Sequence, residues 1–159
     1  MITKILVGVD GSENSEKALD EALEIAEKFD ASVLILNVFQ PPPEFAYNLN
    51  MIPQPSGYPQ DTTSYQPNMV SSIKDLRKVH EDVLLKATER AFKLKPALKI
   101  TAELKEGDSS SQIVETAANG EFDLIVVGHR GYSEIEEFFL GSTSERVAHR
   151  AKCKVLITK

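Results

Sequence analysis

Cysteine is almost missing from this sequence, because Cys153 is the only one among 159 residues. A single thiol excludes an intrachain disulfide framework, the device that stabilises many small proteins of oxidising compartments. The composition therefore favours a reducing cytoplasm, and we expect Cys153 to pack as a small apolar side chain. A signal peptide is not expected either, because Met1 leads directly into a predicted strand.

Basic runs and long apolar runs are also missing. The chain has 18 Lys and Arg against 24 Asp and Glu, which gives a formal net charge of −6 at pH 7. An acidic chain without a Lys/Arg-rich run is not expected to bind nucleic acid. The longest apolar runs have the length of strands, far below the roughly 20 residues that cross a bilayer, so no membrane attachment is expected.

What is present is an alternation of short apolar runs with stretches of helical periodicity. Hydrophobic residues make up 42% of the chain, enough for one core, and we expect a single domain over residues 1–159. The alternation is typical of an α/β fold, a Rossmann-like open sheet of five parallel strands with helices on both faces. Predicted strands cover residues 2–9, 32–38, 100–105, 124–127 and 153–158, and predicted helices cover 13–29, 73–94, 109–119 and 142–150.

Local capping patterns predict where two of these helices begin. Asp108 or Ser109 is expected to cap the third helix, with Ser109 and Gln112 in the spacing of a capping box. Ser142 and Glu145 have the same spacing at the start of the fourth helix. We therefore expect the Ser142 hydroxyl to cap that helix, a role that is compatible with binding an anion.

Residues 40–68 differ in character from the rest of the chain. Every proline except Pro96 lies in them, and their hydrophobic residues show neither helical nor strand periodicity. A structureless connection of this length is uncommon in a compact domain and is usually functional or disordered. We predict a Pro-rich loop insertion. Two interpretations remain open: a tolerated surface insertion, which is favoured, and a segment that partly covers a binding site.

The pattern after the fourth predicted strand indicates a phosphate site. Gly128 ends the apolar run, and Gly131 and the pair Gly141-Ser142 follow in the spacing Gly-x2-Gly-x9-Gly-Ser. Glycine lets a ligand approach the backbone, and the unsatisfied N–H groups at a helix N-terminus attract anions. The chain lacks the Walker sequence Gly-Lys-Ser/Thr, and its glycines are spaced too widely for the dinucleotide fingerprint.

This spacing resembles the nucleotide-binding signature of the universal stress protein family, in its ATP-binding branch. The resemblance continues in the opening segment MITKILVGVDGSENS, in residues 33–38 and in Gly107-Asp108, and it covers nearly the whole chain except residues 40–68. It implies ATP as the ligand and the strand order 3-2-1-4-5. In that order the sheet reverses between strands one and four, so Asp10 and Gly128 are expected to face each other across one crevice.

The resemblance also implies which residues bind ATP. The acid that matches Asp10 lies beside the ribose and phosphates, where it can help hold Mg²⁺ or Mn²⁺, because a carboxylate close to phosphates needs a cation. Val38 matches the position whose backbone meets adenine. Arg130 is either a cation that neutralises phosphate charge or an exposed surface residue. The full set of expected binding residues is Asp10, Val38, Gly128, Arg130, Gly131, Gly141, Ser142, Thr143 and Ser144.

No catalytic residue is assigned from the sequence. His80 lies on the apolar stripe of a predicted helix and is interpreted as a partly buried packing residue, and His129 as a spacer between the signature glycines. No Walker lysine, general base or water-positioning residue stands beside those glycines. We predict an ATP-binding regulatory module of the stress response with an unknown protein partner. The alternative is a slow ATP hydrolase or another adenosine-phosphate enzyme.

A homodimer through the C-terminal strand is the remaining expectation. In the implied order, strands three and five are the sheet edges, whose unpaired backbone groups proteins usually protect. Lys99, Glu103 and Lys105 protect strand three, whereas residues 155–157 of strand five are uninterrupted apolar sequence. Pairing with a second copy around a two-fold axis would satisfy the exposed groups, and the resemblance implies the same dimer.

Overall fold

The computed structural model describes residues 1–41, 66–129 and 141–159. Its five strands form one parallel sheet in the order β3-β2-β1-β4-β5, which confirms the predicted fold class and strand order. The elements, in chain order, are β1 (Lys4–Gly8), α1 (Glu13–Phe29), β2 (Ser32–Phe39), α2 (Gln66–Leu94), β3 (Ile100–Glu106), α3 (Ser109–Asn119), β4 (Leu124–Gly128), α4 (Ser142–Arg150) and β5 (Lys154–Thr158).

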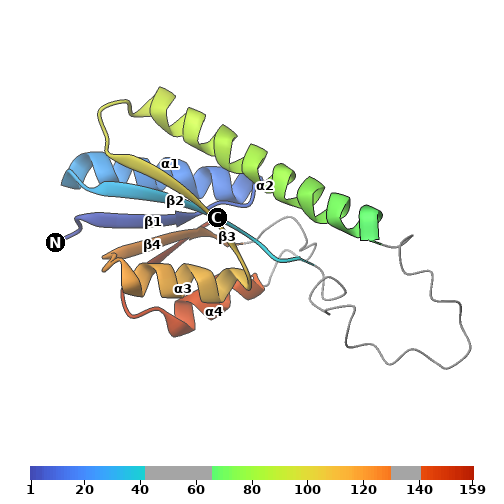
Figure 1. Cartoon of the computed structure of the whole chain (residues 1–159). Helices are drawn as coiled ribbons and strands as arrows, with labels where there is room; N and C mark the ends of the chain where they lie inside the picture. The colour runs from blue at the N-terminus through green and yellow to red at the C-terminus, as the bar shows by residue number, and fades with distance from the viewer. Residues whose placement is uncertain (42–65, 130–140) are drawn as a thin grey trace, which may run out of the picture.

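Helices cover both faces of the sheet, α1 and α2 on one face and α3 and α4 on the other (Figure 1). Ile5 of β1 is fully buried in the core with Ala22 of α1 and Ala91 of α2. The next residue, Leu6, points to the opposite face and packs with Val147 of α4. Because alternate side chains of a strand face opposite ways, a sheet covered twice requires continuous apolar runs, which is the pattern in this sequence.

Helix α2 is longer than predicted and begins inside the predicted loop. It starts at Gln66, whereas the periodicity predicted a start at residue 73 and a structureless segment up to residue 68. Pro67 does not prevent the earlier start, because a proline in the first turn of a helix removes no intrahelical hydrogen bond. The loop prediction was therefore wrong at its C-terminal end, and residues 42–65 lie outside the described residues.

The helix caps confirm one local prediction and overturn two others. Asp108 is the N-cap of α3, so it is the correct one of the two candidates, and the capping box predicted from Ser109 and Gln112 was wrong. At α4, Gly141 is the N-cap and Ser142 is the first helical residue, so the capping box predicted from Ser142 was wrong. The N–H of Gly141 donates a hydrogen bond of 2.7 Å to the carbonyl oxygen of His129, and this contact holds Gly141 at the cap position.

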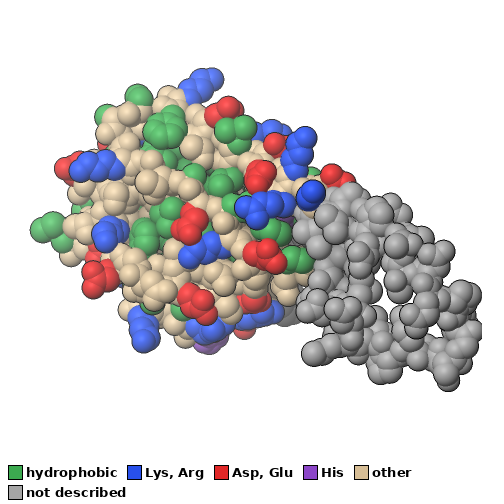
Figure 2. Space-filling model, viewed as in Figure 1, with side chains coloured by type: hydrophobic (Ala, Val, Ile, Leu, Met, Phe, Trp, Pro, Cys, Tyr) green, Lys and Arg blue, Asp and Glu red, His purple; other side chains and the backbone are tan. Residues whose placement is uncertain are grey.

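Charged side chains of both signs are interspersed over the face shown in Figure 2. Several pair with each other, and Arg90 of α2 donates to Asp20 of α1 at 2.6 Å. Exposed pairs of this kind contribute little to stability, so the apolar contacts with the sheet hold these helices in place. None of the helices in the described part of the chain has the length and apolar character needed to cross a membrane.

Candidate functional site

A cavity of about 390 Å³ opens at the carboxyl ends of β1, β2 and β4. The strand order reverses between β1 and β4, which is where open parallel sheets bind their ligands. The predicted residues that line this cavity are Asp10, Val38, Gly128, Gly141, Ser142, Thr143 and Ser144. Two further predicted residues, Arg130 and Gly131, lie outside the described residues.

The N-termini of three helices meet at the cavity. Ser15 from the first turn of α1, Ser109 at the start of α3 and Ser142 at the start of α4 all line it. The first N–H groups of a helix have no intrahelical acceptor and form the positive end of the helix dipole. Their convergence makes the cavity suited to an anionic ligand.

Asp10 contributes a carboxylate to the cavity, and its contacts with Ser12 fix its position. One carboxylate oxygen, Oδ1, accepts hydrogen bonds from the Ser12 N–H at 2.9 Å and from the Ser12 hydroxyl at 2.6 Å. Gly11 lies between them with φ of 86°, a conformation that favours glycine. The other oxygen, Oδ2, has no hydrogen-bond partner among the residues that the structure describes.

Asp10 fits a magnesium ion only in the presence of a nucleotide. The described ranges contain no group of three or more His, Cys, Asp or Glu side chains that could hold a metal ion. Mg²⁺ is commonly held by one or two carboxylates together with water and substrate phosphates. The single carboxylate of Asp10 suits that arrangement, with the remaining oxygens supplied by the ligand and by water.

Ser144 fixes the start of α4 rather than offering its hydroxyl to the cavity. The hydroxyl donates to the carbonyl oxygens of Gly141, at 2.8 Å, and of His129, at 3.0 Å, and the side chain is buried. The hydroxyl is used within the fold, whereas the N–H belongs to the first turn of the helix, which lacks intrahelical acceptors.

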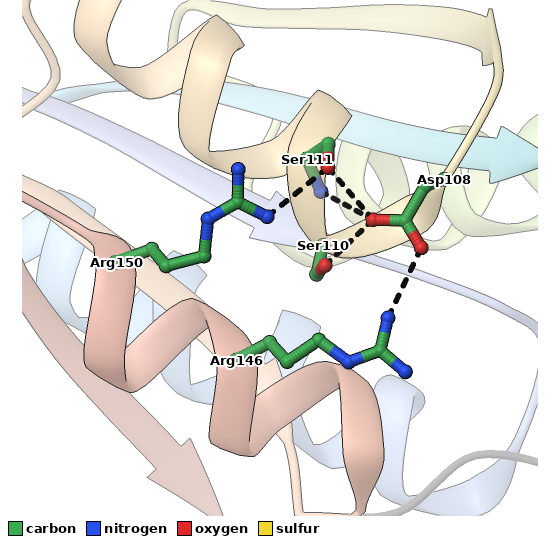
Figure 3. A network of polar contacts seen from close by, with 5 residues as sticks. All are labelled: Asp108, Ser110, Ser111, Arg146 and Arg150. Carbon is green, nitrogen blue, oxygen red and sulfur yellow. Dashed lines mark hydrogen bonds and ion pairs between the residues drawn. The ribbon is translucent and has the colours of Figure 1, made fainter.

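A polar network joins the beginning of α3 to α4 (Figure 3). Oδ1 of Asp108 accepts hydrogen bonds from the hydroxyls of Ser110 and Ser111 at 2.7 and 2.8 Å, and Oδ2 forms an ion pair with Arg146 of α4 at 3.2 Å. A second arginine of α4, Arg150, donates to the Ser111 hydroxyl at 3.1 Å. These contacts hold together two of the helices whose N-termini border the cavity. They also lower the pKa of Asp108 to about 2.

His80 of α2 also lines the cavity. Its ring nitrogen Nδ1 lies 2.8 Å from Oδ1 of Asn37, a fully buried residue of β2. The ring also packs on Phe39, with centroids 5.6 Å apart and planes at 31°. Burial lowers the pKa of His80, and the negative charge of Asp10 opposes that shift. The prediction of a partly buried packing residue is therefore confirmed, but it omitted that the ring borders the cavity.

Comparison with known proteins assigns the chain to a family. The model of the universal stress protein family matches residues 1–159, which is the whole chain. The chain belongs to the universal stress protein family. The universal stress protein YxiE of Bacillus subtilis is 31% identical over 159 residues, which cover 100% of both chains.

Solved universal stress protein structures share the fold. UspA from Lactobacillus plantarum matches with a TM-score of 0.74 at 23% identity, over 99% of this chain and 97% of that one. A universal stress protein in complex with cAMP matches with a TM-score of 0.67 at 29% identity, again over 99% of this chain and 97% of that one. That second protein binds an adenine nucleotide.

The sequence analysis did not identify His80 and Asn37 of this universal stress protein as residues at or next to the cavity. The signal for Asn37 was available, because it is a polar residue inside an otherwise apolar predicted strand, and buried polar groups need partners. The signal for His80 was its place on the apolar stripe of a helix. Neither position indicates that the two side chains meet, because they are separated by residues 38–79 in the sequence.

Proposed function

We propose that this universal stress protein binds ATP in the cavity at the carboxyl ends of β1, β2 and β4. The observation that carries the proposal is the convergence of three helix N-termini on residues of the predicted glycine signature. The positive ends of the three helix dipoles favour phosphate there. A relative of the same fold, 29% identical, is a complex with cAMP, which supports an adenine nucleotide as the ligand class.

In the proposed complex, adenine lies against the backbone of Val38 and the phosphates lie against Gly128, Gly141 and the first turn of α4. Thr143 contributes its amide or hydroxyl, and Arg130 and Gly131 complete the phosphate contacts. Asp10 holds Mg²⁺ or Mn²⁺ together with phosphate oxygens, since its Oδ2 has no hydrogen-bond partner among the described residues.

The proposed role is a nucleotide-dependent regulatory module of the stress response rather than an efficient hydrolase. The sequence lacks the Walker lysine, and no lysine is among the described residues that line the cavity. Fast phosphoryl transfer relies on such cations, together with metal ions, to stabilise the charge of the transition state. A protein partner would then respond to the bound state. We further propose that two copies associate through β5, an edge strand of the sheet.

Thermal unfolding of nucleotide-free protein tests the binding proposal. A ligand that binds only the folded state, at 100 times its dissociation constant, stabilises that state by about 2.7 kcal/mol. Mg-ATP at millimolar concentration is therefore expected to raise the melting temperature by several degrees. An unchanged melting temperature would refute ATP binding. Measuring ADP release in the same samples separates a binding protein from the alternative, a slow hydrolase.

Gly141→Val provides the matching variant. The backbone at Gly141 is extended, with φ −62° and ψ 145°, so valine can adopt it. The added side chain lies where the backbone is proposed to meet phosphate, and the ATP-dependent rise in melting temperature is expected to disappear. Ala118→Val adds a branched side chain at an exposed position of α3 and serves as the control, which keeps the full rise.

A further inference from the structure

A buried asparagine fixes the state of the histidine in the cavity. The Nδ2 group of Asn37 donates a hydrogen bond of 2.7 Å to the carbonyl oxygen of Val9, at the end of β1. A carbonyl oxygen can only accept, so the amide nitrogen of Asn37 must face Val9 and the amide oxygen must face His80. That oxygen lies 2.8 Å from Nδ1 of His80.

The same reasoning assigns the proton on the imidazole. The Asn37 oxygen is also only an acceptor, so Nδ1 of His80 must carry the hydrogen. A neutral imidazole with its hydrogen on Nδ1 has a bare lone pair on Nε2. Burial favours this neutral form, because it lowers the pKa of His80 even though the Asp10 carboxylate acts in the opposite direction. Near pH 7, Nε2 is therefore a hydrogen-bond acceptor.

The orientation of the ring is held before any ligand arrives. The contact of Nδ1 with Asn37 and the packing on Phe39 restrain the imidazole from two sides. His80 lines the cavity, and its Nε2 has no hydrogen-bond partner among the described residues. A preorganised acceptor next to a ligand cavity distinguishes ligands that carry a donor from those that do not.

We propose that His80 is a specificity-determining residue, whose Nε2 accepts a hydrogen bond from an N–H or O–H donor in the nucleoside part of the ligand. The proposal rests on nucleotide binding in this cavity. A lone pair repels phosphate oxygens, which excludes the phosphates as the partner. His80 instead packs on Phe39, beside the Val38 position proposed for adenine. Two donors fit this chemistry: the 6-amino group of adenine and a ribose hydroxyl.

Isothermal titration calorimetry of Mg-ATP with three proteins tests the proposal. His80→Leu removes the acceptor and is expected to weaken binding about fivefold, because a hydrogen bond contributes about 1 kcal/mol and 1.4 kcal/mol is tenfold. His80→Gln retains an N–H donor for Asn37 and a C=O acceptor for the ligand, and it is expected to stay within about threefold of the wild type. Equal ATP affinity of the wild type and His80→Leu would overturn the proposal.

Analogues identify the donor. Purine riboside triphosphate lacks the 6-amino group, and 2′-deoxy-ATP and 3′-deoxy-ATP each lack one ribose hydroxyl. The wild type is expected to bind one of these about fivefold more weakly than ATP, whereas His80→Leu binds that analogue and ATP alike. If His80→Leu keeps the same preference as the wild type for every analogue, the proposal is wrong. A wild type that binds neither ATP nor any analogue refutes nucleotide binding itself, a different outcome.

Two further measurements keep the test independent of folding. His80→Leu leaves the Asn37 oxygen without its partner, so urea unfolding of nucleotide-free His80→Leu is measured as well. The variant is expected to unfold cooperatively and to be fully folded under the conditions of the titration. In addition, ¹⁵N NMR of the His80 ring is expected to show the hydrogen on Nδ1 and a shift of the Nε2 resonance on ATP addition. A hydrogen on Nε2, or an unmoved Nε2 resonance at saturation, would overturn the proposal.

Discussion

At Gly128 the end of β4 passes very close to the first turn of α1. A Cβ atom at this position would lie 2.9 Å from the backbone carbonyl carbon of Asn14 and 2.9 Å from its Cβ. Such contacts force a strand or a helix to move, because interiors are closely packed. This glycine is therefore required by the packing of the fold, in addition to the phosphate contact that the sequence pattern indicates.

Gly128→Ala is consequently expected to destabilise the protein even without nucleotide. Overpacking of this kind costs about 1–3 kcal/mol, because the neighbouring backbone must shift. Urea unfolding of nucleotide-free protein measures the difference, and Ala118→Val, at an exposed position of α3, is the comparison. A Gly128→Ala midpoint equal to that of the wild type would show that the two elements can separate without cost.

The pair Asn37 and His80 shows the limit of sequence reasoning about single residues. Local patterns place Asn37 in a strand and His80 on a helix correctly. What makes them part of a site is a contact of 2.8 Å between distant parts of the chain. Hydrophobic periodicity reports which side of an element is buried, but it carries no information about which residue of another element lies opposite.

Among the elements, α3 and α4 are joined by the charge on Asp108. The hydrogen bonds from Ser110 and Ser111 and the ion pair with Arg146 lower the pKa of Asp108 from 3.8 to about 2. A lowered pKa means that the folded state binds the proton less tightly than the unfolded state. The stabilisation is therefore complete above about pH 4 and is lost as the pH falls towards 2.

Asp108→Asn is expected to reveal this dependence, because asparagine also caps helices but carries no charge. At pH 7 the variant should be less stable by about 1 kcal/mol, a discounted figure because the carboxylate is 40% exposed and solvent screens it. Between pH 4 and pH 2 the two proteins should converge in their free energies of unfolding. Glu115→Gln, an exposed acid on the same helix, is the control. A difference independent of pH would contradict this account.

Helix boundaries were predictable where local chemistry determines them. Helix α1 has the predicted bounds, since Ser12 caps its beginning and Asp30 ends it with φ of 54°. The cap residue of α4 was predicted wrongly, because Ser142 and Glu145 happen to have capping-box spacing. The N-cap is Gly141, whose N–H donates to the carbonyl oxygen of the distant His129. Tertiary contacts decided that boundary.

For the whole molecule, the alternation of strands and helices sufficed to predict an α/β fold but not the order of its strands. Residues 5–7 and 124–126 are similar apolar runs, and nothing in their composition says that they pair. The order came from the family resemblance, and with it the location of the cavity. The apolar pattern predicts which side chains of a strand are buried. Which strands lie next to each other in the sheet depends instead on the segments that connect the strands and on the geometry of the loops.

The proposed homodimer makes a prediction at this scale. In β5, the N–H of Lys154 and the carbonyl of Thr158 bond towards β4, so the backbone groups of Val155 and Ile157 face outward at the sheet edge. Ile157→Pro removes an outward donor and is expected to convert a dimer of twice 17.6 kDa into a monomer, as measured by light scattering.

Its control is Ala102→Pro, which removes an outward donor from the opposite edge strand, β3, where odd-numbered residues bond towards β2. That variant should remain a dimer. A wild type of 17.6 kDa at micromolar concentration would show that β5 does not mediate association.

The position of His80 along α2 has a mechanical consequence. Helix α2 runs from Gln66 to Leu94, so His80 lies at its midpoint, and Ala91 in its second half is buried in the core that α2 shares with α1 and the sheet. A ligand that bonds to His80 would therefore contact α2 at its middle, away from the first turn at Gln66. With a rise of about 1.5 Å per residue, the Gln66 end lies about 20 Å away from His80. If a ligand that bonds to His80 tilted the helix by about 5°, the Gln66 end would move by about 2 Å, so binding in the cavity would be felt at a distant surface.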